Sequence, residues 1–308
     1  MTARRDASAV LCCLAVFVSA SAARAQVDPQ RAEKIRAAAP VKASAAPRKA
    51  RTVLIWNTPP ALMDQDPHKG YCIPFGECAF RTLGEKTGAF KPVVSGDLVM
   101  YTPEKIKQFD AIVMNNSSGP WIQPTDADMA KLKPLGSDKQ AVEKLLRKSL
   151  LDYVSGGGGI VACHYAIGAN GQWPEFRDLL GAKFTGHPWN EEVGIKNEEP
   201  ANPLLAAFGG KDFRLADEIY QFGDPYARKD LRVLLSLDTK ATNMNVKWID
   251  RKDGDFALAW VKRQGEGRIF YCGFGHRTEI WWNAAILRFY LDAIQFAVGD
   301  LAAPTEAR

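Results

Sequence analysis

The sequence predicts an α/β protein with a largely parallel sheet and helices on both faces of that sheet. Two observations support this fold class. Short runs of consecutive apolar residues, typical of strands buried on both faces, alternate with segments whose apolar residues recur at helical spacing. In addition, roughly 250 residues follow Arg51, which is enough for one large domain with a substantial core.

The predicted elements follow one another along the chain. The strands are the apolar runs at residues 52–56, 91–94, 110–115, 160–163, 183–185, 232–237, 257–262 and 268–273, and the helices are the stretches at residues 77–87, 138–154 and 280–298. The glycines at 156–159 end the second helix. Because they precede a strand, whereas a phosphate-binding loop must precede a helix, we expect no nucleotide cofactor.

The first 25 residues have the three parts of a secretion signal. Arg4 and Arg5 precede an apolar run at residues 9–20, and a small-residue cleavage site follows at Ala23–Ala25. That run is roughly a dozen residues long, and no other segment approaches the about 18 apolar residues that a membrane-spanning helix needs. We therefore expect cleavage near Ala25, no stable membrane insertion, and a periplasmic or secreted protein.

Residues 26–51 are rich in Ala, Pro, Lys and Arg and hold almost no large apolar side chain. This composition predicts a disordered linker. Residues 1–51 contain ten Lys/Arg and three Asp/Glu, a surplus of seven positive charges; since the whole chain carries +5, the remainder carries −2. The electrostatic case for a nucleic-acid partner is therefore weak. Residues 301–308 are expected to form a short tail.

The cysteines are interpreted by compartment and by sequence context. Cys72 and Cys78 lie in a Gly/Pro-containing stretch and are candidates for a local disulfide in an oxidising compartment, with two unpaired thiols as the alternative. Cys163 and Cys272 lie inside apolar runs, where a free cysteine behaves as a small core residue.

Three histidines come at or just after the ends of predicted strands, where ligands bind in open parallel sheets. They are His164, His187 and His276. Each alone has an ordinary interpretation as a hydrogen-bonded structural histidine, but three together indicate one site. Imidazole ligands suit Zn²⁺ or another divalent metal, so these three are the candidate metal ligands. Proton transfer by the same side chains is the competing interpretation.

Carboxylates and aromatic rings complete the candidate site. Asp217 and Glu218 lie on opposite faces of an extended segment, so one of them can enter the site, although a solvated loop carboxylate is the alternative. Glu279 follows His276 by three residues and can orient its ring. The catalytic candidates are therefore His164, His276, Glu218 and Glu279, and the substrate-binding candidates are Tyr165, Trp189, Trp281 and Asn115. Flat aromatic rings suit the faces of sugars, and they suit an ordinary core equally well.

Several separate motifs occur in an order that points to a known family. They are GGGGIVACHYA, WPEFRDLLGAKFTGHPW, DEIYQF, VLLSLD, DGDFALAWVKRQGEGRIFYCGFGH and a closing Trp-rich helix. Over nearly all of residues 52–299 the chain resembles the ThuA-like (trehalose utilisation) family. The resemblance implies a domain at residues 52–300 with the flavodoxin-like three-layer sandwich of class I glutamine amidotransferases. It also implies a role in bacterial carbohydrate metabolism, where relatives are tied to trehalose and to 3-keto sugars.

The resemblance also bears on the nucleophile of glutamine amidotransferases, which sits in a Gly-x-Cys-x-Gly elbow after a central strand. The equivalent stretch here is Ala162–Ala166, which places His164 at the elbow and Cys163 one residue earlier, turned to the other face of the strand. His276 resembles the amidotransferase histidine, with Glu279 close to its carboxylate partner. A thiol hydrolase that uses Cys163 is therefore a disfavoured alternative.

We predict an exported enzyme that processes a sugar or 3-keto-glycoside by acid–base or metal-assisted hydrolysis, elimination or isomerisation. Its partner would be a small-molecule carbohydrate. A base beside a keto-sugar can remove the proton α to the carbonyl, and a metal can polarise that carbonyl. The alternative is a non-catalytic carbohydrate-binding protein, which would lose affinity only modestly on histidine replacement, whereas an enzyme would lose turnover by orders of magnitude.

Overall fold

The structure is a computed structural model that describes residues 27–308. The predicted signal peptide at residues 1–25 lies outside the described residues. Among residues 27–308, no helix combines the length and the hydropathy of a membrane span.

A nine-stranded mixed sheet runs through the described part of the protein, with the strand order β2-β1-β3-β4-β9-β8-β7-β5-β6. The five strands from β2 to β9 pair in parallel, and every pairing from β9 to β6 is antiparallel. The predicted sheet, parallel at its centre, is therefore confirmed. The strands are β1 (Thr52–Trp56), β2 (Lys91–Ser95), β3 (Ala111–Asn115), β4 (Gly159–Cys163), β5 (Lys183–Asn197), β6 (Phe213–Gly223), β7 (Arg232–Leu237), β8 (Ala257–Gln264) and β9 (Gly267–Cys272).

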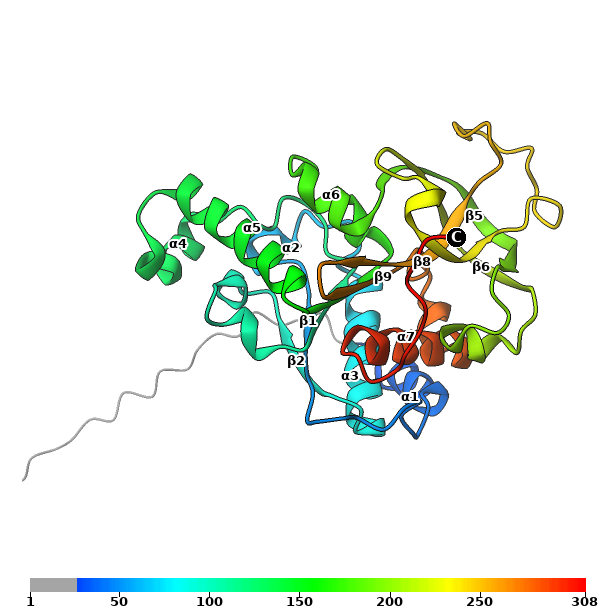
Figure 1. Cartoon of the computed structure of the whole chain (residues 1–308), viewed down its shortest axis with the longest axis horizontal. Helices are drawn as coiled ribbons and strands as arrows, with labels where there is room; N and C mark the ends of the chain where they lie inside the picture. Colours follow the sequence, from blue (N-terminus) through cyan, green and yellow to red (C-terminus); the bar gives the residue numbers. More distant parts are fainter. Residues whose placement is uncertain (1–26) are drawn as a thin grey trace, which may run out of the picture.

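Helices cover both faces of this sheet, as Figure 1 shows. The α-helices are α1 (Pro29–Ala38), α2 (Pro60–Met63), α3 (Cys72–Thr87), α4 (Asp126–Leu132), α5 (Lys139–Ser155), α6 (Pro174–Leu180) and α7 (Ala284–Ala297). The 3₁₀ helices are η1 (Leu98–Tyr101), η2 (Ile106–Gln108), η3 (Lys133–Leu135), η4 (His164–Gly168), η5 (Pro203–Phe208), η6 (Arg228–Asp230) and η7 (Thr278–Trp282).

Alternation along the strands divides the apolar core into two layers. On β1, Val53 and Ile55 face a layer that includes α1, α3 and α7, whereas Leu54 and Trp56 face a layer that includes α4, α5 and α6. The two layers with the sheet between them form the three-layer sandwich implied by the family resemblance.

Local sequence patterns locate most elements closely. The strands at residues 52–56 and 232–237 have the predicted bounds, and five others differ by one or two residues at an end. The helix α5 begins after Asp138, whose carboxylate accepts a hydrogen bond from Ala141 N, and it ends before Gly156. The predicted closing helix is divided, because the Asn283 side chain accepts from the first turn of α7 and separates it from η7.

The expectation of a disordered segment at residues 26–51 is wrong for the described part of that segment. It contains α1, which buries Ile35 completely, and Lys86 of α3 donates to the carbonyl of Ala39. The Gln295 side chain in α7 accepts from the backbone N–H groups of Ser44 and Ala45. The segment is therefore ordered largely by polar contacts, which the absence of large apolar side chains does not reveal.

The predicted Cys72–Cys78 disulfide is not formed. All four cysteines in the described residues, namely Cys72, Cys78, Cys163 and Cys272, are free. Cys72 and Cys78 lie six residues apart on the single helix α3, and a rise of 1.5 Å per residue separates them by about 9 Å along the axis, beyond the reach of a disulfide.

The buried pairing of Arg51 with Asp300 gives a stability prediction. Arg51 donates to Asp300 at 2.6 Å and to Asp110 at 3.0 Å, and the Asp300 side chain is fully buried. Arg51→Ala leaves the buried Asp300 carboxylate without its charged partner, so we expect a loss of about 3–5 kcal/mol in unfolding free energy, measured by urea denaturation.

Lys49→Ala is the matched control, since Lys49 also pairs with Asp110 but is 65% exposed. Its expected loss is below about 0.5 kcal/mol. Equal losses in the two variants would contradict a special role for the buried pair.

Candidate metal centre

Four side chains from four separate segments meet near the carboxyl ends of the central parallel strands. They are His68, His164, Glu218 and His276, and their potential ligand atoms all lie within 4.8 Å of one another. His68 lies in the loop between α2 and α3, and His164 follows β4 directly. Glu218 belongs to β6, and His276 lies between β9 and η7.

The antiparallel part of the sheet folds back to bring Glu218 to this site. β6 is the last strand in the sheet order, whereas β4 and β9 lie near the centre. β5 nevertheless packs against η4, and β6 contacts β8, which is not its sheet neighbour. The sheet must therefore curl, so that a side chain from its edge reaches residues that follow its central strands.

His164 adopts a backbone conformation that is uncommon for a residue with a side chain. Its φ is +48°, and strained residues of this kind persist when the surrounding structure fixes them. The ring donates from Nδ1 to the carbonyl of Gly273 at 2.7 Å. This bond selects the tautomer whose Nε2 carries the lone pair, and Nε2 accepts from the Tyr220 hydroxyl at 2.5 Å.

Close packing behind His164 requires a glycine at position 275. Gly275 has a φ of +146°, and a Cβ there would lie 3.3 Å from the His164 Cβ and 3.0 Å from the Cys163 Sγ. A side chain at this position would push the two histidine-bearing segments apart.

The Glu218 carboxylate contacts three imidazoles. Its Oε2 lies 3.4 Å from His164 Nε2 and 3.3 Å from His276 Nδ1, and its Oε1 lies 3.4 Å from His187 Nδ1. Burial by itself would raise the pKa of Glu218, but the hydrogen bond to His164 and the positive charges that the three imidazoles carry when protonated in acid outweigh it and lower the pKa to about 2. Glu218 is therefore ionised at neutral pH.

Burial has the opposite effect on the histidines. It lowers the pKa of the fully buried His164 ring, and the neighbouring Glu218 offsets only part of that effect. The pKa of His276 is lowered for the same main reason. Neutral imidazoles beside an ionised carboxylate are the protonation states that a divalent metal requires.

Two buried aspartates hold the histidine-bearing segments in place. The Asp66 carboxylate accepts from the backbone N–H of His68 at 2.8 Å and lies 3.3 Å from its Nδ1. Asp217, next to Glu218 on β6, points to the other face and accepts from Gly275 N and Arg277 N at 2.7 Å each. Burial raises the pKa of Asp217 to about 6 despite these donors. Both carboxylates fix the ligand-bearing backbone rather than entering the group of four.

Solvent reaches the site on the side of β5. The His187 side chain is 44% exposed, whereas those of His276 and Glu218 are 19% and 10% exposed. Tyr71 and Tyr165 are half-buried beside the group, and the Tyr71 hydroxyl lies 3.4 Å from His276 Nε2. The Tyr165 ring lies 5.1 Å from the ring of His68.

The group of four that could hold a metal differs from the predicted ligand set: His187 is absent, and His68 and Glu218 are added. The predicted set was His164, His187 and His276, and the structure brings the first and third together with Glu218. His187 lies inside β5 rather than at a strand end, because that strand runs from Lys183 to Asn197, and it contacts the group only through Glu218. His68 takes its place.

His68 was not among the predicted site residues because it does not follow a strand directly. His68 lies twelve residues beyond Trp56, which is the last residue of β1, and α2 lies between them. The available signal was that His68 is the remaining one of only four histidines, in the loop that follows the first parallel strand.

Four other predicted site residues lie outside the group of four. Glu279 is exposed, and its carboxylate accepts from Thr278, so it does not orient His276. Asn115 is fully buried and donates to Asn57 and to the carbonyl of Ile73. Trp189 and Trp281 are buried in the core, against Phe256 and Tyr290 respectively. Apolar packing, the alternative interpretation of these tryptophans, is therefore the correct one.

Thiol chemistry at the elbow is disfavoured by the structure. Cys163 is fully buried, and burial raises the pKa of its thiol well above the ordinary value. Its Sγ lies 3.2 Å from the Tyr290 hydroxyl, on the side of the core layer that contains α7.

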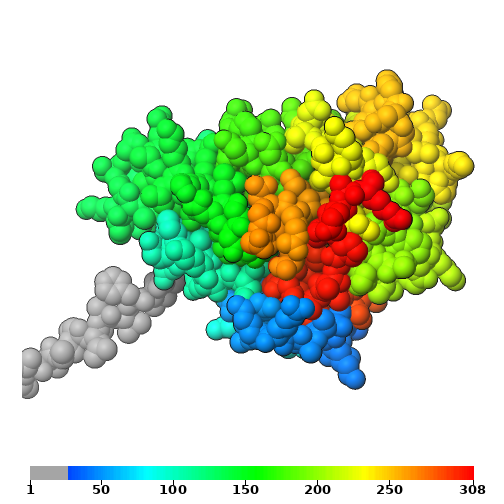
Figure 2. Space-filling view, viewed as in Figure 1, coloured from blue at the N-terminus to red at the C-terminus, as the bar shows by residue number. Residues whose placement is uncertain are grey.

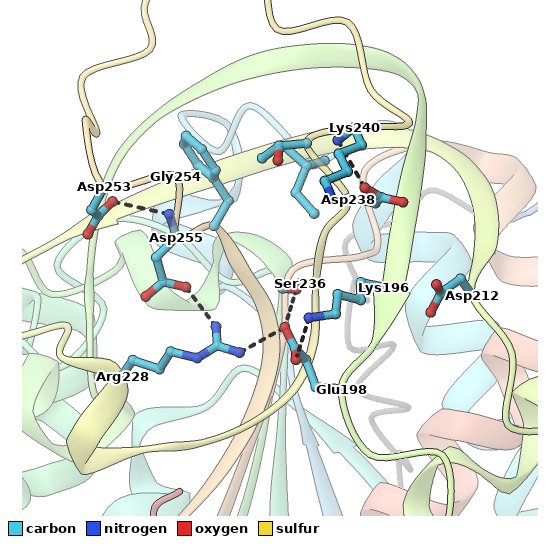
Figure 3. A pocket seen from close by; sticks show the side chains of 13 residues that line it. Lys196, Glu198, Asp212, Arg228, Ser236, Asp238, Lys240, Asp253, Gly254 and Asp255 are labelled. Carbon is cyan, nitrogen blue, oxygen red and sulfur yellow. Dashed lines mark hydrogen bonds and ion pairs between the residues drawn. The ribbon is translucent and has the colours of Figure 1, made fainter.

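A separate polar cavity of about 540 Å³ lies beside β7 and is shown in Figure 3. Its central charges are paired with one another. Glu198 contacts Lys196 at 3.1 Å and Arg228 at 2.8 Å, and Arg228 contacts Asp255 at 2.7 Å. Because these charges already neutralise one another, the cavity is a weaker candidate for chemistry than the histidine group.

Three imidazoles and one carboxylate form a donor set that suits Zn²⁺ and the other divalent first-row transition metals. Mg²⁺ and Ca²⁺ prefer sites made of oxygen ligands. The residues therefore fit the divalent metal predicted from the sequence, with one carboxylate added to three imidazoles.

The fold and this group define an α/β protein whose central strands end at a His/Glu group that could hold a metal ion. The family model ThuA, described as trehalose utilisation, matches residues 53–297, and the chain belongs to this carbohydrate-related family. A ThuA-like protein from Bacteroides uniformis is similar in structure, with 24% identity and a TM-score of 0.57 over 82% of this chain and 92% of that one. A ThuA-like protein from Parabacteroides merdae has 15% identity and a TM-score of 0.53 over 83% of this chain and 92% of that one. Both likenesses show the fold, and no curated protein matches the chain.

The two histidine assignments can be separated by metal analysis. We expect His68→Ala to remove most of the bound metal, because it deletes one of the four ligands, whereas His187→Ala keeps near-stoichiometric metal. The measurement is elemental analysis of protein purified without chelator and supplied with Zn²⁺. The exposed Glu279→Gln is the control for substitution near the site. Loss of metal in His187→Ala with retention in His68→Ala would reverse the assignment.

Asp66 gives a prediction about positioning. Asp66→Asn keeps the size of the side chain but removes the charge beside His68, so we expect Zn²⁺ affinity to fall about 10–100-fold, measured by competition with a chromogenic chelator. Asp64→Asn changes an aspartate two residues away whose side chain is 97% exposed, and its affinity should match wild type. Equal affinities in all three proteins would show that Asp66 does not position the ligand.

Proposed function

We propose that the protein is an exported enzyme that processes a sugar or 3-keto-glycoside at a divalent transition-metal centre formed by His68, His164, Glu218 and His276. The observation that carries the proposal is the convergence of three imidazoles and one ionised carboxylate in a chain of the trehalose utilisation family. Export is supported by the signal-like pattern in residues 1–25.

The chain's own residues would hold the metal and manage a proton. A metal bound here would supply Lewis acidity that polarises a carbonyl. His187 is the accessible base: its Nδ1 faces Glu218 Oε1, so Nε2 is available to take the proton α to that carbonyl. Removal of this proton is the first step of both elimination and isomerisation.

Tyr71 is suited to return a proton. Burial is the main cause that raises the pKa of its hydroxyl, so the phenol stays protonated at neutral pH. Its hydroxyl lies 3.4 Å from His276 Nε2, and the half-buried side chain is partly accessible to solvent. His164 itself is an unsuitable base, because its Nδ1 donates to Gly273, its Nε2 would hold the metal, and the residue has no exposed surface.

The test is turnover of two 3-keto-glycosides, the 3-keto derivative of trehalose and methyl 3-keto-glucoside, by Zn²⁺-loaded protein. We expect activity that chelation abolishes and metal restores. His187→Gln should keep its metal and lose about 10²-fold or more in kcat, because it removes the base but not a ligand. Turnover that survives chelation unchanged, or that is normal in His187→Gln, would contradict the mechanism.

The same experiment addresses the carbohydrate-binding alternative. A binding protein would retain sugar affinity and show no turnover of either compound in any metal state. The half-buried Tyr71 and Tyr165 beside the group are compatible with such a role. Binding alone, however, does not account for a buried ionised carboxylate surrounded by three imidazoles.

A further inference from the structure

The loop between β7 and β8 carries an unusual tryptophan. Residues 238–256 leave the sheet as a long excursion that protrudes at the upper right of Figures 1 and 2. Within it, the Trp248 side chain is 70% exposed, and among the large hydrophobic side chains of residues 27–308 only Val41 is comparably exposed. Six of the other seven tryptophans are buried and Trp282 is partly buried.

Exposure alone would carry no meaning, but the backbone of Trp248 is also strained. Its φ is +70°, in the left-handed region that aromatic residues rarely adopt. Such conformations persist only where neighbouring groups impose them, and they concentrate at ligand-binding sites.

The group that imposes this conformation comes from the strand that carries Glu218. Gln221 on β6 is fully buried, and its amide donates to the carbonyl of Trp248 at 2.6 Å and accepts from Asp250 N at 3.0 Å. A buried side chain that uses both ends of its amide on this loop fixes the position of Trp248 relative to the proposed metal centre.

A short series of rings connects Trp248 to that centre. The indole lies edge-to-face with His187, with ring centroids 6.2 Å apart, and His187 Nδ1 lies 3.4 Å from Glu218. The His187 ring in turn lies parallel to Phe184, which packs on Tyr220. Trp248 is therefore one side chain farther from the carboxylate than the proposed base, on the exposed side.

We infer that Trp248 is a specificity-determining residue that stacks against a second sugar ring, next to the ring that reacts. This inference rests on the proposed function, because it takes the reacting ring to lie at Glu218 and His187. The apolar C–H face of a pyranose removes the exposed indole from water, and the fixed backbone lowers the entropy lost on binding. The substrate class is then a two-ring glycoside rather than a single sugar.

The experiment compares one-ring and two-ring compounds on the full mature, Zn²⁺-loaded protein. We expect Trp248→Ala to lower kcat/KM for the 3-keto derivative of trehalose about tenfold, mainly through KM, and to leave methyl 3-keto-glucoside within about twofold. Trp248→Phe keeps a smaller aromatic face and should fall between wild type and Trp248→Ala. Val41→Ala, which removes the other exposed hydrophobic side chain, should match wild type. Equal losses on both compounds, or no loss on either, would overturn the inference.

A second measurement does not depend on turnover. Acrylamide quenches exposed tryptophans, so Trp248 should dominate the quenchable fluorescence, and Trp248→Phe should remove that component. Saturating trehalose should protect Trp248 from quenching while glucose does not. If trehalose protects Trp248 but neither keto compound is turned over, the enzyme proposal and the specificity role that rests on it fail, while the contact between Trp248 and a sugar ring stands. If the keto compounds are turned over but the ring number makes no difference to either measurement, the stacking inference fails alone.

Discussion

The contact of one carboxylate with three imidazoles is the constraint on which the site depends. His164, His187 and His276 come from three different segments, and each ring approaches Glu218 within 3.4 Å. Without the negative charge of this carboxylate, the buried His164 ring and the mostly buried His276 ring would each lose a polar partner, which costs free energy for groups removed from water. Glu218 can supply that charge only because the antiparallel strands curl back over the centre of the sheet, so the geometry of the site and the topology of the fold are a single requirement.

The side chains of β6 serve the site in two ways: some contact the histidine group, and others hold the neighbouring backbone in place. Successive residues of a strand point to opposite faces. Glu218 accordingly enters the histidine group, while Asp217 binds the backbone of residues 275–277 behind it. Farther along the same strand, Tyr220 contacts His164 and Gln221 fixes the loop at Trp248. Any shift in the register of β6 by one residue would therefore exchange the site side chains for the structural ones.

The sequence predicted the elements whose signals lie in neighbouring residues. It did not predict which distant segments meet. Apolar runs and helical spacing located the parallel strands and α5 because those signals need only neighbouring residues. His164 and His276 could be singled out because His164 directly follows β4 and His276 comes four residues after the end of β9. His68 could not, since α2 separates it from β1, and His187 was misplaced because the length of β5 is set by pairing with β6 rather than by its own composition. The tryptophans Trp189 and Trp281 illustrate that ring type alone does not distinguish a core from a binding surface.

The polar contacts of the segment before β1 have a consequence for the order of folding. Ser44 binds Gln295 and Arg51 binds Asp300, pairs that are separated by 251 and 249 positions in the sequence. Contacts of such long range form slowly, because most of the chain must be closed into a loop before they can stabilise anything. Residues 44–51 therefore cannot complete these contacts until the last helix has been synthesised. The segment before β1 therefore joins the two ends of the domain late in folding.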